Sequence, residues 1–297
     1  MKKLALSLLL AALALCGQTA GVQPTKFSGK DAFKYTEALT QFGPRPSGSP
    51  ELDRARKFIE ASLTSWKLKP EIDSFVEPTP VGKLPMYNYI VKFPGANDRV
   101  IIIAGHYDTK RFKEFKFLGA NDGGSSAGVL LELARVLSLT PKRANTVWIV
   151  FHDGEEAQEG PWTTEDSLHG ARHLAAKLQT SGEIKKIKAL INIDMIGNRN
   201  LSILRDTNSA PWLNNLVREQ AASLGLGKIF NSDATDMQDD HLPYIAAGVP
   251  SVDLIDFTSV DTFWHKAGDT MDKQSADSME AMGRVLLASI DAIGKRP

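Results

Sequence analysis

The sequence has little of several features that mark common protein classes. Among its 297 residues Cys16 is the only cysteine, so the mature chain has no internal disulfide and no thiol nucleophile. Basic and acidic residues both number 35, and no long run of like charge occurs, so we expect no nucleic-acid partner. The His-Glu-x-x-His zinc motif of other metalloproteases and a phosphate-binding glycine loop are also absent.

The N-terminus is the most apolar part of the chain. Two lysines precede an apolar run over residues 4–15, which is short for a bilayer span, and small and polar residues follow it at once. We interpret residues 1–20 as a signal peptide and expect an exported protein, periplasmic or secreted, with no transmembrane span in the mature chain. Lipid anchoring at Cys16 is an open alternative, although Leu15 is larger than the residue that precedes the cysteine of a lipoprotein box.

Apolar periodicity predicts alternating helices and strands along the rest of the chain. Helices are expected over residues 31–42, 51–68, 125–139, 166–178, 211–224 and 275–293. Extended segments are expected over residues 87–93, 99–106, 146–151, 188–193, 201–204 and 251–255. This alternation predicts an α/β fold, a three-layer sandwich in which helices cover both faces of a mixed, mostly parallel central sheet. With no internal repeat or linker, residues 21–297 are interpreted as a single catalytic domain.

Polar side chains follow three of the predicted strands. They are His106 and Asp108, then His152, Asp153, Glu155 and Glu156, then Asn192 and Asp194. Ligands in open α/β sheets bind outside the carboxyl ends of the strands. The pattern therefore predicts that histidine and carboxylate groups from three strands meet at one edge of the sheet.

These residue types suit zinc, which takes histidine nitrogen and carboxylate oxygen and keeps one position open in catalytic sites. The candidates are His106, Asp122, Glu155 or Glu156, Asp194 and His265. Neighbouring side chains of an extended segment point in opposite directions. One carboxylate of the Glu155–Glu156 pair can therefore face a metal while the other acts as a general base.

The chain resembles the zinc aminopeptidase superfamily in five motifs that occur in order. They are His106-Tyr107-Asp108, Asn121-Asp122, Asp153-Gly154-Glu155-Glu156, Asp194-Met195-Ile196-Gly197 and His265. Within that superfamily it is similar to the glutaminyl cyclases, which are glutaminyl-peptide cyclotransferases. That similarity rests on Trp162, residues 166–174, Gln238-Asp239-Asp240-His241, Gly248-Val249-Pro250 and Trp264. The resemblance extends from about residue 31 to the C-terminus.

The resemblance implies a zinc-dependent enzyme and a role for each matching position. Asp122, Glu156 and His265 would bind one zinc ion. Glu155 would be the general acid and base, with Asp194 and Asp239 completing an acidic network whose repulsion raises its pKa. Trp162, Trp264 and Gln238 would contact the substrate, a peptide or protein with N-terminal glutamine. Its cyclisation would give a pyroglutamyl product and ammonia, and we expect the enzyme to act as a monomer.

Other readings of the same residues stay open. The two-zinc aminopeptidases of the superfamily use the same three ligands and add the His106 and Asp194 positions, so two zinc ions are expected if the chain is an aminopeptidase. In a cyclase, those two residues would only orient the site. A catalytically inactive binding protein should have lost a ligand or Glu155, yet every position is present.

Two further patterns are weaker. Residues 124–128 fit the Gly-x-Ser-x-Gly pattern of serine hydrolases, but a loop rather than a strand is expected before them, so we interpret them as a helix start. His169 and His173 lie one helical turn apart, which could suit a metal, but we interpret them as part of a polar helix face. His152 is expected to pack beneath the site.

Overall fold

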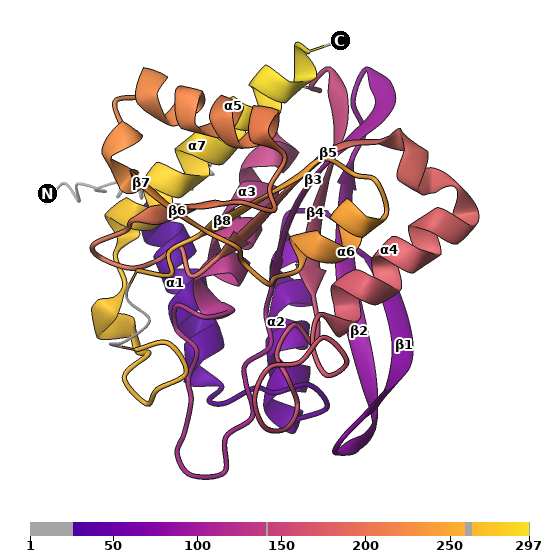
Figure 1. Ribbon diagram of the computed structural model, residues 1–297, viewed down its shortest axis with the longest axis vertical. Coiled ribbons are helices and arrows are strands. Elements are labelled where there is room, and N and C mark those ends of the chain that lie inside the picture. The colour runs from indigo at the N-terminus through magenta and orange to yellow at the C-terminus, as the bar shows by residue number, and fades with distance from the viewer. Residues whose placement is uncertain (1–25, 141, 259–262, 297) are drawn as a thin grey trace, which may run out of the picture.

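The computed structural model describes residues 26–140, 142–258 and 263–296, so the predicted signal peptide and Cys16 lie outside the described residues. Its central sheet has the strand order β1-β2-β4-β3-β5-β8 (Figure 1). The strands are β1 (Glu71–Thr79), β2 (Gly82–Phe93), β3 (Asn97–His106), β4 (Asn145–His152), β5 (Ile187–Asp194) and β8 (Ser251–Ile255). The pairs β1–β2 and β2–β4 are antiparallel, and the other three are parallel. This confirms the mixed, mostly parallel sheet.

Helices cover both faces of this sheet, which confirms the three-layer sandwich (Figure 1). One face packs against α1 (Gly29–Gln41), α2 (Pro50–Ser65), α3 (Gly124–Leu139), α5 (Pro211–Ser223) and α7 (Ala276–Gly294). The other packs against α4 (His169–Ser181) and α6 (His241–Ala246). Alternation within β3 explains the two cores, because Ile101 and Ile103 join the first and Ile102 and Ala104 join the second.

Serine residues fix where three of these helices begin. The hydroxyl groups of Ser28, Ser49 and Ser275 accept backbone N–H groups at the starts of α1, α2 and α7, and Pro50 occupies the first turn of α2. Helix α3 begins instead after Gly123, whose φ of 73° lies in the left-handed region. That turn brings the loop before α3 back across the carboxyl ends of the strands.

The structure differs from the sequence-based expectation in several elements. Strands β1 and β7 (Phe230–Thr235) and helix α6 were not expected; β1 is a largely exposed edge strand and α6 is very short. The strand expected over residues 201–204 is β6 (Ile203–Asp206), which pairs with β7 in a small parallel sheet. The helix expected from residue 166 begins at His169, because Leu168 before it has a φ of 53°. Short 3-10 helices occupy Glu183–Lys186, Gly227–Ile229 and Met271–Lys273.

One correction concerns the glutamate pair. Strand β4 ends at His152, and Gly154 then turns the chain with a φ of 70°. Glu155 and Glu156 therefore lie in the loop after the strand, not in an extended segment as expected. Within the part of the chain that the structure describes, no helix is long and apolar enough to cross a membrane.

Candidate metal centre and active-site pocket

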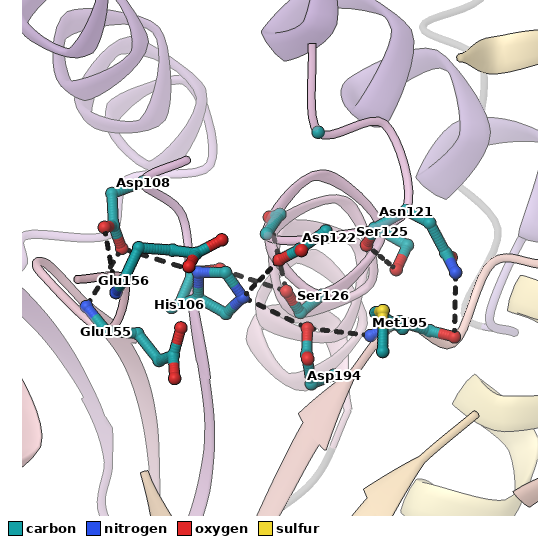
Figure 2. A network of polar contacts seen from close by, with 12 residues as sticks. His106, Asp108, Asn121, Asp122, Ser125, Ser126, Glu155, Glu156, Asp194 and Met195 are labelled. Atoms are coloured by element: carbon teal, nitrogen blue, oxygen red, sulfur yellow. Dashed lines mark hydrogen bonds and ion pairs between the residues drawn. The ribbon is translucent and has the colours of Figure 1, made fainter. Parts of the chain in front are cut away.

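Parallel register brings His106 and Asp194 together at the carboxyl edge of the sheet. In β3 and β5, Ala104 pairs with Asn192, two residues before this histidine and this aspartate. His106 Nε2 lies 3.1 Å from Asp194 Oδ1 and 3.2 Å from Asp122 Oδ1, which enters from the loop before α3 (Figure 2). The predicted meeting of groups from separate strands at one edge is thus found.

A second cluster joins Asp122 to Glu156 and His265, the three ligands that the family resemblance implied. His265 Nε2 lies 3.1 Å from Glu156 Oε1 and 3.5 Å from Asp122 Oδ2. In a tetrahedral zinc site with bonds near 2.1 Å, ligand atoms are roughly 3.4 Å apart. Asp122 Oδ2 is also buried without a hydrogen-bond partner, which would be costly in the absence of a cation. The donor set and its spacing therefore fit zinc.

The two clusters share Asp122 and meet the same geometric test. Their histidine and carboxylate ligand atoms all lie within 4.8 Å of one another, close enough to hold an ion. Among the described residues, these two clusters are the groups of three or more potential metal ligands that meet this test. Their geometry supports metal binding and leaves the number of ions open.

Buried carboxylates hold the backbone of both ligand-bearing loops. Asp108 Oδ1 accepts the N–H of Glu155 at 3.2 Å, and its Oδ2 accepts that of Glu156 at 3.4 Å (Figure 2). Asp269 accepts the N–H groups of Asn121 at 2.8 Å and of Asp122 at 3.1 Å. Each carboxylate thereby fixes the peptide from which a candidate metal ligand projects.

Arg45 and Asp269 were not identified from the sequence. The Arg45 guanidinium is fully buried and donates to the backbone oxygens of Tyr107, Leu118 and Gly119, so it holds the loop that precedes Asp122. Burial lowers its pKa to about 10 and raises the pKa of Asp269 to about 7. Asp269 follows His265 by four residues, and that proximity was its only sequence signal.

Glu155 occupies an environment that favours a bound proton. Burial raises its pKa well above the usual value, and the nearby carboxylates of Glu156, Asp240 and Asp194 add to this, while His106 opposes it. Burial likewise raises the pKa of Asp239. We expected like-charge repulsion as the cause, but desolvation is the larger contribution.

A pocket of about 270 Å³ opens beside these groups. Its lining includes Asp122, Glu155, Glu156, Asp194, His265, Asp239, Trp162, Trp264 and Gln238, all of which were named from the sequence. His106 does not line it, and its side chain is only 1% exposed. The structure thus gathers every candidate residue at one place, with His106 below the pocket surface.

Aromatic rings surround the candidate ligand His265, which itself has a φ of 52° in the left-handed region. The Trp264 ring stacks on it at 4.1 Å, and Phe257 meets Trp264 edge to face at 4.9 Å. Phe112 and Phe117 contact the imidazole with their edges at 5.8 and 5.7 Å. These contacts restrict the imidazole to one orientation and give the pocket an apolar wall.

Several pocket residues escaped the sequence analysis. They are Met195, Thr235, Asp236, Met237, Ile255 and Phe257. Ile255 ends β8, so its position at a strand terminus was a usable signal. Thr235 ends the unexpected strand β7, and the others lie in loops.

The remaining patterns have structural roles. Ser125 Oγ donates to the backbone oxygen of Asn121 and Ser126 Oγ to that of His106, which argues against a serine nucleophile. His173 stacks on Phe75 at 4.0 Å, and His169 Nδ1 lies 3.3 Å from Glu77 Oε1. These two histidines belong to neither metal cluster among the described residues.

Comparison with known proteins agrees with this site. The model of peptidase family M28 matches residues 88–290. Glutaminyl-peptide cyclotransferase of Drosophila melanogaster is 31% identical over 84% of this chain and 79% of its own length. The crystal structure of glutaminyl cyclase from an Acidobacteriales bacterium superposes with a TM-score of 0.87 at 40% identity, covering 94% of this chain and 98% of that one. The glutaminyl cyclase structure of Porphyromonas gingivalis gives 0.82 at 28% identity, covering 90% and 98%.

The family match and the two metal clusters point to the same family of proteins. The family model spans the strands and loops that carry all of the metal-ligand candidates, and the relatives cover most of the chain. The chain is therefore a member of peptidase family M28 and belongs to its glutaminyl-peptide cyclotransferases.

Proposed function

We propose that the protein cyclises the N-terminal glutamine of peptides or proteins, releasing ammonia and leaving pyroglutamate. The observation that carries this proposal is the position of Glu155, a buried carboxyl that lines the pocket beside the Asp122–Glu156–His265 cluster. A carboxyl that readily holds a proton suits an acid–base role.

The residues divide the reaction between them. Zinc bound by Asp122, Glu156 and His265 supplies Lewis-acid polarisation of the side-chain carbonyl. A Glu155 carboxylate oxygen accepts a proton from the α-amine as its nitrogen bonds to the side-chain amide carbon. Glu155 then gives that proton to the amide nitrogen, the carbon–nitrogen bond breaks, and ammonia leaves. Asp194 and Asp239 bias Glu155 toward holding the proton.

The pocket walls suit a small, uncharged side chain. Trp162 and Trp264 line the pocket, and the second of these is fixed between Phe257 and His265. Exclusion of water by such walls disfavours hydrolysis. Gln238 lies at the mouth, in reach of the substrate backbone.

We also propose that one zinc ion serves catalysis. His106 Nε2 contacts both Asp122 and Asp194, and its Nδ1 lies 3.4 Å from Asp108 Oδ1, so carboxylates face both sides of the ring. This arrangement lets His106, from below the pocket, and Asp194, from the pocket wall, orient Asp122. Elemental analysis of the purified protein should give one zinc per chain, and His106→Ala should keep it. Two zinc ions per chain, with one lost in that variant, would show a two-metal site.

The cyclase and the aminopeptidase make different products from the same substrate. The zinc-loaded protein is incubated with a glutaminyl dipeptide amide, and ammonia and product masses are recorded. Release of ammonia with the peptide bond intact supports cyclisation, whereas free glutamine would show an aminopeptidase. The N-acetylated dipeptide, which lacks the attacking amine, is the matched control and should not react.

Export, a single domain over residues 21–297 and a monomeric state remain part of the proposal. The apolar N-terminal segment followed by small residues supports export. N-terminal sequencing of the protein from cell fractions and its mass in solution test these points.

A further inference from the structure

The mouth of the pocket carries a carboxylate that the proposed reaction does not use. Asp236 lines the pocket and its residue is exposed to solvent. It forms no ion pair with any residue in the described ranges. A charged group on the rim of a substrate pocket, without a counter-ion, is available to the substrate.

The backbone beside Asp236 is held in place. The N–H of Met237 donates to Asp206 Oδ1 at 3.0 Å, and the Met237 carbonyl accepts Asn208 Nδ2 at 3.0 Å. Asp206 is itself buried and accepts Ser209 Oγ at 2.5 Å. Both polar backbone groups of Met237 are hydrogen-bonded, so the chain next to Asp236 is anchored to the segment that carries Asp206 and Asn208.

Exposure along this segment alternates. Met237 is buried, while Asp236 and Gln238 on either side of it are exposed, and all three residues line the pocket. Asp236 therefore lies at the pocket close to Gln238, which we placed against the substrate backbone.

The charge of the pocket has a single sign. Six of its lining residues are carboxylic acids: Asp122, Glu155, Glu156, Asp194, Asp236 and Asp239. Among the described lining residues none is lysine or arginine. Zinc held by Asp122 and Glu156 would compensate their charge, and the other three inner carboxylates are buried, so Asp236 is the carboxylate that an arriving substrate meets at the solvent-facing rim.

We infer that Asp236 forms a subsite for the side chain that follows the glutamine, and that this subsite selects peptides with lysine or arginine there. The inference rests on the proposed function, since cyclisation places the glutamine inside the pocket and its neighbour at the mouth. A cationic second residue pairs with Asp236, whereas an acidic one is repelled by it.

Steady-state kinetics on three pentapeptide amides test the inference. They begin Gln-Arg, Gln-Ala and Gln-Glu and are otherwise identical, and ammonia release gives kcat/KM for each. Exposed ion pairs are weak, so we expect Gln-Arg to exceed Gln-Ala by about two- to fivefold, with Gln-Glu below both. Raising the salt concentration should narrow this range, since exposed charges are screened.

Asp236→Asn should bring the three values together, and Asp236→Lys should make Gln-Glu the best of the three. The matched control is Asp233→Asn, which removes an exposed carboxylate of β7 that does not line the pocket. It should keep the wild-type ranking. Zinc content and the thermal midpoint of each variant report whether the rim and the metal centre remain intact.

The outcomes separate this inference from the proposed function. Cyclisation of all three peptides with equal kcat/KM, unchanged in Asp236→Asn, would overturn the subsite and leave the cyclase standing. The same loss of ranking in Asp233→Asn would attribute it to general surface charge and also overturn the subsite. Failure to release ammonia from every peptide would overturn the proposed function itself.

Discussion

His152 Nδ1 lies 3.0 Å from Asp240 Oδ2, and this contact joins the two loops that carry Glu155 and Asp239. On its other side, His152 Nε2 lies 3.1 Å from the Tyr244 hydroxyl of α6. All three side chains are buried, as was expected for the histidine. The Asp240–His152–Tyr244 chain therefore sets the distance between the acid–base residue and a second carboxyl of the pocket.

Replacing His152 should slow turnover without loss of the metal. His152→Leu leaves Asp240 buried without its partner, so Glu155 and Asp239 shift, and we expect kcat to fall by about 10- to 100-fold with little change in KM. His152→Asn keeps a donor toward Asp240 and should recover part of that loss. Stopped assays measure kcat and KM of both variants, and zinc analysis measures their metal content. A lower thermal midpoint with normal kcat would show that His152 has a purely structural role.

The glutamate pair separates chemistry from metal binding. Glu155→Gln should abolish turnover, about 10²-fold or more, while zinc remains bound, because this residue moves the proton. Glu156→Gln should weaken zinc retention instead, since an amide oxygen is a poorer ligand than a carboxylate. Metal content after dialysis against a chelator distinguishes the two variants. If Glu155→Gln loses zinc and Glu156→Gln keeps it, the two roles are reversed.

Asp269 should matter for zinc affinity although it is not a ligand. Its two oxygens accept the N–H groups of Asn121 and Asp122, and asparagine can accept only one of them. We expect Asp269→Asn to weaken zinc binding about 10- to 100-fold, the usual effect of losing a group that orients a ligand. Competition with a zinc chelator measures it, and unchanged affinity would refute the positioning role.

The Asp206–His241 pair predicts a pH-dependent contribution to stability. Burial favours a high pKa, but hydrogen bonds from His241, Ser209 and the Met237 N–H lower the pKa of Asp206 to about 2, against 3.8 when unpaired. A lowered pKa stabilises the fold above pH 3.8, and this contribution is lost as the pH falls toward 2. The pKa of His241 is raised, so its contribution is present below pH 6.5 and is lost as the pH rises through the folded value.

The destabilisation caused by Asp206→Asn should therefore be greatest between about pH 4 and 6.5, where it should reach about 1–3 kcal/mol. Urea unfolding of the zinc-free protein at several pH values measures it without interference from metal release. A difference from wild type that does not vary with pH would contradict the linkage.

Much of the fold follows from local sequence patterns. The continuous apolar run in β3 and the helical spacing of apolar residues in α7 each indicated their element, because a strand buried on both faces and a helix buried along one stripe leave distinct patterns. Strand β1 escaped detection because it lies at the sheet edge and exposes much of its length. Helix α6 has six residues, too few for a periodic pattern.

The candidate metal ligands could be named from the sequence because each follows a strand or belongs to a recognisable motif. The sequence did not identify Asp269 and Arg45, because each acts through contacts with a segment far away in the chain. It did not identify Asp236 either, because the role of that residue depends on its place on the pocket rim. Asp269 lies 147 residues from the Asp122 N–H that it accepts. No local pattern encodes such a contact.

The sequence by itself determined the layered α/β fold, the residues available for zinc and the Glu155 carboxyl beside them. Their types and positions after strands are local properties, and parallel strands must end at one edge. The tertiary structure decided where the glutamate pair lies after β4, which buried carboxylates hold the two loops that carry the candidate ligands, and where Asp236 lies on the pocket rim. These depend on distances between segments remote in sequence, which only the packed sheet and its loops establish.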